Sequence, residues 1–196
     1  MNYCLFCGTF NPIHNAHLRV AKHVSDKFRF EKIIFIPTFI APHKKVFDVS
    51  AEHRLEMVKL AIAQNKKFEV SDIEFQTNEK SYTYNTVIRL NEIYNNSEKW
   101  PFIIGTDAFD QIKNWYKTDE FKKLVKYIVL TRSNNTELQK YDYLKKDGYD
   151  FEFTNLSFCD ISSTEIRKKV ECGEDISELV PPEVENYIYE HGLYKN

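Results

Sequence analysis

One stretch near the start of the chain, Tyr3 to Arg19, constrains the fold more than any other. It opens with a short apolar run from Tyr3 to Cys7, which has the length and composition of a buried strand. A turn containing glycine and proline follows, and a helical pattern begins directly after it. His14 and His17 lie where that helix begins. The stretch therefore predicts a strand, a tight turn and a helix whose start carries two histidines.

A helix start with two histidines suits a phosphate group. The first turn of a helix has unpaired N–H groups and a partial positive charge, and residues three apart share one face. Both imidazoles can therefore reach the same ligand. Two alternatives stay open at this point. His14 and His17 could form half of a zinc site completed by His43 or His53, or either histidine could have a structural role only.

The spacing of Cys4 and Cys7 also matches a redox or zinc-binding pair. On a strand, however, an odd separation places two side chains on opposite faces. A redox pair would also need a helix N-terminus to lower the pKa of its thiol. We therefore interpret both cysteines as small apolar strand residues in a reducing compartment.

Strand-like and helical segments alternate along the whole chain. The expected strands are Tyr3–Cys7, Lys32–Pro37, Phe68–Phe75, Pro101–Ile104, Tyr127–Thr131 and Phe151–Phe153. The expected helices follow His14, Ser50 (as the N-cap of Ala51–Gln64), Thr83, Trp115, Glu137 (to Lys146), Ser162 and Pro181. This alternation predicts a single domain over residues 1–196. Its fold class is α/β, with a doubly wound, Rossmann-like, mainly parallel sheet of five or six strands between flanking helices.

In such sheets ligands bind at the carboxyl ends of the strands. The unusual segments of the chain all fall there, namely Gly8–His17, Thr38–Lys44, Gly105–Asp107, Arg132 and Ile161–Arg167. The last of these is a second helix start rich in hydroxyl groups. It predicts either a simple N-cap with Glu165 in the first turn or a second phosphate cradle with Arg167 one turn further on.

Charge and hydropathy exclude two classes of partner. The 27 Lys and Arg residues balance 29 Asp and Glu residues, giving a net charge of −2, which argues against nucleic acid as a main partner. No apolar run approaches the roughly 18 residues that a membrane span needs. The first residues do not combine a basic region with a long apolar stretch. We therefore expect a cytoplasmic protein without a membrane partner.

Two segments resemble a known family. The run from Gly8 to His17, G-T-F-N-P-I-H-N-A-H, resembles the first signature of the nucleotidylyltransferase superfamily, G-G-T-F-D-P-I-H-x-G-H. The run from Ile161 to Arg167, I-S-S-T-E-I-R, resembles the second signature, I-S-S-T-x-I-R. Between them, three segments resemble the pattern of the bacterial nicotinate-mononucleotide adenylyltransferases: Pro42-His43-Lys44, Ser81-Tyr82-Thr83, and Ile104-Gly105-Thr106-Asp107 with Trp115. Three positions depart from the first signature: Cys7 and Ala16 replace glycines, and Asn11 replaces the usual Asp.

The resemblance implies an enzyme of NAD biosynthesis that joins ATP to nicotinate mononucleotide, giving nicotinate adenine dinucleotide and pyrophosphate. It implies Mg²⁺ bound mainly through the ATP phosphates, without dedicated protein ligands, and it leaves a homodimer open. Three alternatives remain: a nicotinamide-mononucleotide enzyme, a phosphopantetheine adenylyltransferase, and a nucleotide-binding protein without catalysis.

The same resemblance implies roles for particular residues. His14 and His17 are the expected catalytic residues, with His17 stabilising charge on the transferred group. The expected ATP-binding residues are Gly8, Thr9, Phe10, His14, His17, Gly105, Asp107, Arg132, Ile161, Ser162, Ser163, Thr164 and Arg167, so the helices from about residue 162 onward would complete the ATP site. The expected mononucleotide-binding residues are Thr38, Lys44, Thr83, Asp107, Trp115 and Tyr116. Trp115 is expected to stack on the pyridine ring.

Overall fold

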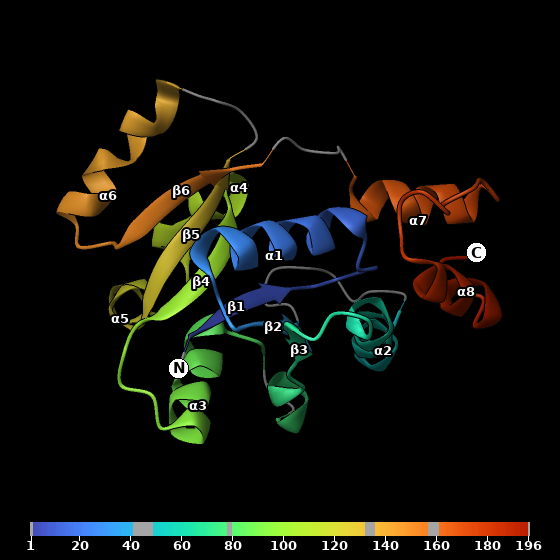
Figure 1. Ribbon diagram of the computed structural model, residues 1–196, viewed down its shortest axis with the longest axis horizontal. Helices are drawn as coiled ribbons and strands as arrows, with labels where there is room; N and C mark the ends of the chain where they lie inside the picture. Colours follow the sequence, from blue (N-terminus) through green and yellow to red (C-terminus); the bar gives the residue numbers. More distant parts are fainter. Residues whose placement is uncertain (1, 41–48, 78–79, 132–135, 157–160, 196) are drawn as a thin grey trace.

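A six-stranded parallel sheet forms the centre of the molecule (Figure 1). The computed structural model describes residues 2–40, 49–77, 80–131, 136–156 and 161–195 of the chain. The strands are β1 (Tyr3–Gly8), β2 (Lys32–Pro37), β3 (Phe68–Val70), β4 (Trp100–Gly105), β5 (Val125–Thr131) and β6 (Phe151–Asn155). They pair in the order β3-β2-β1-β4-β5-β6, and every pair is parallel. The winding direction reverses between β1 and β4, which confirms the doubly wound α/β fold.

Helices connect the strands and cover the sheet. The α-helices are α1 (Asn15–Phe28), α2 (Ala51–Ile62), α3 (Thr83–Tyr94), α4 (Thr106–Phe109), α5 (Thr118–Leu124), α6 (Asp142–Lys146), α7 (Ser163–Glu171) and α8 (Pro182–Glu190). The described residues also form three short 3₁₀ helices: η1 (Ile73–Gln76), η2 (Ile112–Asn114) and η3 (Thr136–Tyr141). None of the helices in the described ranges is long and apolar enough to cross a membrane.

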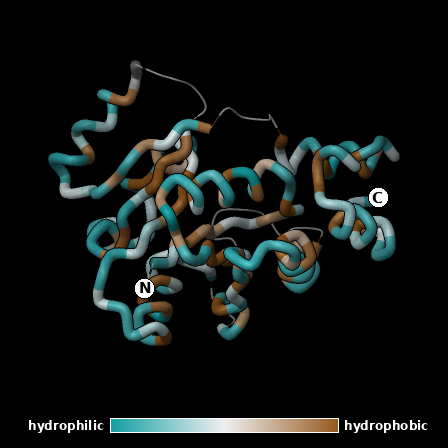
Figure 2. Tube along the Cα trace, viewed as in Figure 1, coloured by the Kyte–Doolittle hydropathy of each residue, from teal (hydrophilic) through white to brown (hydrophobic). Residues whose placement is uncertain are grey.

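The sheet separates two apolar cores. Because side chains alternate along a strand, Cys4 and Ile33 pack against α1, α2, α7 and α8, whereas Leu5 and Ile34 pack against α3, α5 and η2. Figure 2 shows the central strands in brown and much of the outer helical surface in teal. Cys4 lies in the first core and Cys7 packs against the second, so the two thiols occupy opposite faces, as their odd separation predicts.

The expected strand from Phe68 to Phe75 is wrong beyond Val70. The β3 ladder ends where the Ser71 N–H donates to the Phe35 carbonyl at 2.9 Å, and the chain then turns into η1. The Ser71 hydroxyl accepts a hydrogen bond from the Ile73 N–H at 3.4 Å, which favours a turn over an extended chain. Ile73 and Glu74 are both buried in this turn. The expected helix from Glu137 to Lys146 is divided between η3 and α6.

The C-terminal helices lie at the carboxyl edge of the sheet. In Figure 1, α7 and α8 gather beside the start of α1, at the end toward which β1 points. The Asn15 N–H donates to the Leu179 carbonyl at 2.9 Å, which ties the first turn of α1 to the segment before α8. The segments far apart in sequence that the two signatures occupy are therefore neighbours in space.

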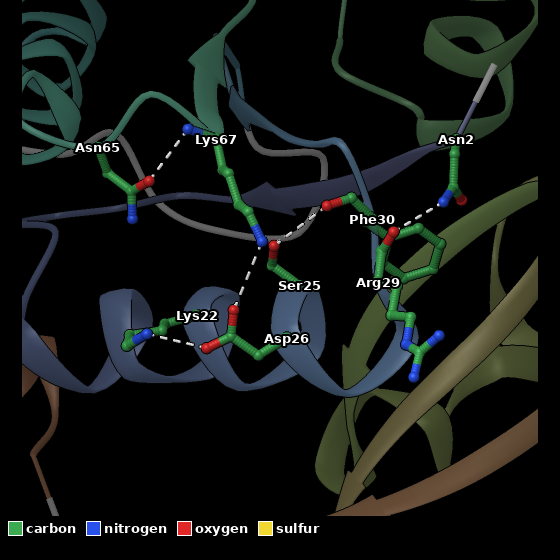
Figure 3. A network of polar contacts seen from close by, with 8 residues as sticks. All are labelled: Asn2, Lys22, Ser25, Asp26, Arg29, Phe30, Asn65 and Lys67. Carbon is green, nitrogen blue, oxygen red and sulfur yellow. Dashed lines mark hydrogen bonds and ion pairs between the residues drawn. The ribbon is translucent and has the colours of Figure 1, made fainter.

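The opposite end of α1 is fixed by a separate polar network (Figure 3). Asp26 accepts from Lys22 at 2.8 Å within the helix and forms an ion pair with Lys67, before β3, at 3.6 Å. Arg29 caps the helix in the left-handed region, with φ of 57°, and its carbonyl accepts from the Asn2 side chain at 2.8 Å. These exposed contacts each contribute little to stability, but together they define where α1 ends.

Candidate active site

The segment from Gly8 to His17, which we call the histidine turn, links β1 to α1. Phe10 adopts a φ of 48° and folds its ring back over Gly8. A Cβ atom at Gly8 would lie 2.9 Å from the tip of that ring, so any side chain there would displace it. The Phe10 ring is itself buried and packs edge-on against Phe6 and His17. Core packing of the Phe10 ring thus fixes the turn.

His14 and His17 lie together at the start of α1, as the sequence predicts. Their rings stack with centroids 3.7 Å apart and planes 27° apart. The backbone N–H of His14 donates to Nδ1 of the His17 ring at 3.3 Å. Because Nδ1 accepts this bond, the proton of neutral His17 sits on Nε2, which can donate to a ligand.

Both imidazoles are neutral near pH 7. Burial lowers the pKa of His14 to about 4. Burial and, to a lesser degree, the neighbouring His14 ring lower the pKa of His17 well below its ordinary value. Nδ1 of His14 is buried without a hydrogen-bond partner among the described residues. A buried nitrogen without a hydrogen-bond partner is a local cost in stability.

The second signature braces the histidine turn. From α7, Ser163 donates its hydroxyl to the Pro12 carbonyl at 2.9 Å, and Arg167 donates to the Asn11 carbonyl at 2.8 Å. From beyond α8, the Tyr194 hydroxyl donates to the Asn11 side-chain oxygen at 2.7 Å. The two phosphate-binding segments expected from sequence therefore meet, and the side chains of Ser163 and Arg167 are engaged in holding one to the other.

A cavity of about 380 Å³, which we call the aromatic pocket, opens beside the histidine turn at the carboxyl ends of β1 and β4. Its lining includes seven residues that the sequence predicts as site residues: Gly8, Thr9, Thr38, Thr83, Gly105, Trp115 and Tyr116. A pocket at the point where the strand order reverses is the position expected for the ligand of a doubly wound sheet.

The aromatic pocket offers flat rings and a helix N-terminus. Trp115 is half-buried and stacks on Phe121, with centroids 5.9 Å apart and planes 17° apart. Tyr82 and Tyr116 lie 4.4 Å apart at their ring centroids. Thr83 begins α3, so the unpaired N–H groups of that helix start lie at the pocket wall. Such a pocket suits a flat heteroaromatic ring that carries an anionic group.

The other predicted site residues lie around these two features. Asp107 is exposed on α4, between the pocket residues Gly105 and Ala108, but is not itself part of the lining. A Cβ atom at Gly105 would meet nothing within 4 Å, so no protein contact requires glycine there. Ile161 and Ser162 precede α7, and the Ser162 hydroxyl accepts from the Glu165 N–H at 3.2 Å as an ordinary N-cap. His43, Lys44 and Arg132 lie outside the described residues.

The three departures from the first signature have local explanations. Asn11 uses its side-chain oxygen as the acceptor for Tyr194, a role that does not need a charge. Ala16 is buried in the first turn of α1, where its methyl group joins the core. Cys7 lines the aromatic pocket, and burial raises the pKa of its thiol well above the ordinary value, with a smaller contribution from nearby Glu74. The thiol therefore stays protonated.

The described residues do not form a zinc site around the histidine turn. In the described part of the chain, no group of three or more His, Cys, Asp and Glu side chains is placed to hold a metal ion. His53, one of the two residues considered as a third ligand, instead bonds the Tyr187 hydroxyl at 2.9 Å. A Mg²⁺ ion that binds mainly to phosphate oxygens needs few protein ligands, so this site remains compatible with one.

Sequence reasoning missed part of the pocket wall. Ser81, Tyr82, Tyr84, Phe102, Ile104 and Ala108 line the pocket but were not among the expected binding residues. Ser81 and Tyr82 flank Thr83, and Phe102 and Ile104 alternate along β4 toward Gly105. Their position at the carboxyl end of β4 or beside Thr83 is the signal that could have found them.

Comparison with known proteins defines the class. Residues 5–169 match the model of the cytidylyltransferase-like family, and the chain belongs to that family. A relative from Caldicellulosiruptor saccharolyticus is 40% identical over 199 residues, covering 100% of both chains. One from Staphylococcus epidermidis is 40% identical over 191 residues, covering 97% of this chain and 95% of its own. Both carry the name "Probable nicotinate-nucleotide adenylyltransferase". The chain belongs, more particularly, to the nicotinate-nucleotide adenylyltransferases.

A solved structure shares the fold. The nicotinic acid mononucleotide adenylyltransferase of Plasmodium falciparum, complexed with NaAD, superposes with a TM-score of 0.81. The alignment covers 98% of this chain and 97% of that chain, at 22% sequence identity. This likeness confirms the arrangement of sheet and helices described above.

Proposed function

We propose that the chain transfers the adenylyl group of ATP to nicotinate mononucleotide, giving nicotinate adenine dinucleotide and pyrophosphate. The observation that carries the proposal is the direct adjacency of two features. The histidine turn suits a triphosphate, and the aromatic pocket beside it suits a flat ring bearing a carboxylate. Thr9 and Gly8 belong to both, so the two substrates would meet at the carboxyl end of β1.

The reaction needs positioning rather than a covalent intermediate. A phosphate oxygen of the mononucleotide attacks the α-phosphorus of ATP and forms the new P–O bond. The bond from that phosphorus to the bridging oxygen of the β-phosphate breaks, and pyrophosphate leaves with the electron pair. Both reactants are anionic, so the protein's task is to align them in line and offset their charge.

His14 and His17 are proposed to act on the phosphates. The Nε2–H of His17 would donate to an oxygen of the transferred group, where negative charge grows in the transition state. The N–H groups that begin α1 would hold the same triphosphate. Because the two rings stack 3.7 Å apart, the protein favours at most one imidazolium in the pair. A bound anion raises the affinity of that ring for its proton.

The helices from about residue 162 onward are proposed to complete the ATP site. The first turn of α7 carries Ser163 and Thr164, whose N–H groups point from a helix N-terminus. Arg167 lies one turn further on, with Nη2 donating to the Thr164 hydroxyl at 3.1 Å. We assign Gly105, Asp107, Arg132 and Ile161 to the same substrate as predictions from the resemblance.

The aromatic pocket is proposed to bind the mononucleotide. Trp115 would stack on the pyridine ring, with its other neighbours Phe121 and Phe102 fixing its orientation. The backbone N–H groups near Thr83 and Tyr116 would donate hydrogen bonds to the nicotinate carboxylate, which favours the acid over the amide. Thr38, Lys44 and Asp107 are assigned to the phosphate and ribose of the same substrate.

Mg²⁺ is the proposed cofactor. It would neutralise phosphate charge and would be held by the phosphate oxygens of ATP, while the protein holds those phosphates through the starts of α1 and α7. Association of two copies stays a prediction, which light scattering at several concentrations would measure.

One assay tests the proposal. The protein is given ATP, Mg²⁺ and one of three acceptors: nicotinate mononucleotide, nicotinamide mononucleotide or phosphopantetheine. Pyrophosphate release is followed. We expect the fastest release with nicotinate mononucleotide. A faster rate with the amide would overturn the substrate assignment, and no release with any acceptor would exclude the enzyme.

A further inference from the structure

Two charged side chains are buried outside the residues assigned to the substrates. Arg54 on α2 and Glu74 on η1 are exposed by 1% and 6%, and among the described residues they are the buried Arg, Lys, Asp and Glu side chains. Burying a charge is costly unless it is paired and hydrogen-bonded. Neither residue is needed to form its helix, so what they contact decides why they are there.

Arg54 connects the ends of two neighbouring strands. Its Nη1 donates to the Thr9 carbonyl at 2.7 Å, and its Nη2 donates to the Phe39 carbonyl at 3.1 Å. Thr9 belongs to the histidine turn after β1, and Phe39 lies two residues beyond the end of β2. The planar guanidinium fork fixes the separation of these two carbonyls, which a lysine could not do.

Glu74 holds the same peptide segment from its other side. Its Oε2 accepts from the Phe39 N–H at 3.2 Å, and its Oε1 accepts from the Thr86 hydroxyl on α3 at 2.7 Å. The Phe39 N–H also lies 3.0 Å from the Ser81 hydroxyl oxygen, and the Ser81 N–H donates to the Ile40 carbonyl at 2.9 Å. The segment after β2 is therefore tied to the start of α3.

These contacts join two parts of the lining of the aromatic pocket. Thr38, directly before Phe39, lies on one wall, and Ser81 to Thr83 lie on another. Arg54 fixes the first wall to the histidine turn, and Glu74 fixes it to α3. We propose that Arg54 and Glu74 are positioning residues that set the width of the aromatic pocket and its distance from the histidine turn. The inference rests on the proposed function, because it gives that pocket to the mononucleotide.

Arg54 and Glu74 contact different segments, so the loss of each should have a different effect on the two substrates. Within the described part of the chain, the hydrogen bonds of Glu74 go to the segment after β2 and to α3, so its loss should affect the mononucleotide. Arg54 also touches Thr9 in the histidine turn, so its loss affects both substrates. If the two residues served only to stabilise the core, replacing either one would lower the melting temperature and leave both KM values unchanged.

The test uses the full chain and the variants Glu74→Gln, Arg54→Lys and Thr86→Val, with Glu69→Gln on the exposed face of β3 as the matched control. Pyrophosphate release is measured with ATP and nicotinate mononucleotide each varied, and thermal unfolding is recorded for every variant. We expect Glu74→Gln to raise the KM for the mononucleotide by about tenfold with the KM for ATP nearly unchanged. Arg54→Lys should raise both KM values, and Thr86→Val should raise the mononucleotide KM by a smaller factor.

A double variant separates positioning from charge balance. Arg54→Met with Glu74→Gln removes both charges, so the melting temperature should recover toward that of the unmodified chain relative to Glu74→Gln alone. The KM for the mononucleotide should stay high, because the bonds to Phe39 remain changed. Recovery of KM together with stability would overturn the inference.

The outcomes also separate this inference from the proposed function. If the unmodified chain releases no pyrophosphate, the proposed function fails. If it does, and folded Glu74→Gln and Thr86→Val variants keep its KM values, the positioning role alone is wrong. Thr86→Val removes only one hydroxyl group, so it decides the question even if Glu74→Gln does not fold.

Discussion

The histidine turn and the aromatic pocket lie side by side but are assembled in different ways. The histidine turn is one continuous stretch of ten residues, Gly8 to His17, and its polar groups are braced by bonds from α7 and Tyr194. The aromatic pocket is built from five separated segments, which meet only because the sheet brings them together. Its walls are joined through a buried Arg54 and Glu74.

This difference teaches how each region should respond to change. The histidine turn acts through a few polar atoms at fixed positions, so losing one atom should affect the rate of reaction. The aromatic pocket acts through the shape and separation of its walls, so most changes there should affect the binding of one substrate. The predictions below follow from this contrast.

The largest effect is expected for His17→Ala. Removing a donor that meets developing charge typically lowers kcat by about 10²- to 10³-fold, and we expect that loss here with little change in the mononucleotide KM. Steady-state kinetics with both substrates varied measures it, with His191→Ala on the exposed end of α8 as the control. A kcat within a few-fold of the unmodified chain would remove the catalytic role of His17 and with it the contrast between the two regions.

The next largest effect is expected in the free energy of unfolding, which should fall at acid pH. Burial lowers the pKa of His14 to about 4, below its ordinary value near 6.5, so between those values the unfolded chain binds the extra proton. The free energy of unfolding should therefore fall as pH decreases through this window, by roughly 3 kcal/mol from this residue, and should be flat with respect to it above pH 7.

Urea unfolding at pH 7.5, 6, 5 and 4.5 measures this dependence. The variant His14→Asn serves as the comparison, because it cannot take up the proton and should show a shallower slope. Equal slopes for the two proteins would contradict the burial of a neutral His14 ring. Bound ATP should reduce the slope, since an anion favours the protonated ring.

A smaller and more selective effect is expected for Trp115→Ala. Stacking of a base on an aromatic side chain contributes about 1–3 kcal/mol, so the mononucleotide KM should rise by roughly 10- to 100-fold, with the ATP KM unchanged. Trp115→Phe should recover part of the loss, because a flat ring remains. A rise in the KM for ATP instead would place Trp115 with the wrong substrate and would overturn the division of the site into two regions.

The smallest effect is expected for Tyr194→Phe. The variant removes the bond to the Asn11 side-chain oxygen and should cost about 1 kcal/mol of stability or a little more, since that oxygen is left without its donor. We expect a rise of a few-fold in the KM for ATP and none in that for the mononucleotide. Thermal unfolding and kinetics measure both, with Tyr189→Phe on the exposed face of α8 as the control. An effect on the mononucleotide alone would contradict the bracing role.

The sequence predicted the histidine turn better than the aromatic pocket for a physical reason. The turn is local, so its glycine, its two histidines and the following helix are all visible within one stretch. Its brace was also predictable in part, because the Ile161–Arg167 segment carries a second helix start. The bond from Tyr194 was not predictable, since nothing near Tyr194 in the sequence indicates that it reaches Asn11.

The pocket was predicted only in part because its walls depend on tertiary contacts. Thr38, Thr83, Trp115 and Tyr116, which the sequence analysis names as candidate site residues, line the pocket, whereas Arg54 and Glu74 are not among its candidates. Expecting a strand as far as Phe75 concealed Glu74, because alternation would have placed it beside solvent.

The bond between Tyr194 and Asn11 spans 183 residues, and this separation matters while the chain is being made. A protein emerges from the ribosome with its N-terminal end first. The two histidines and the whole of β1 are therefore present long before α7 and Tyr194 exist to brace the turn that carries them. A partly synthesised chain holds the signature without these bonds, which can form only when the last helices dock.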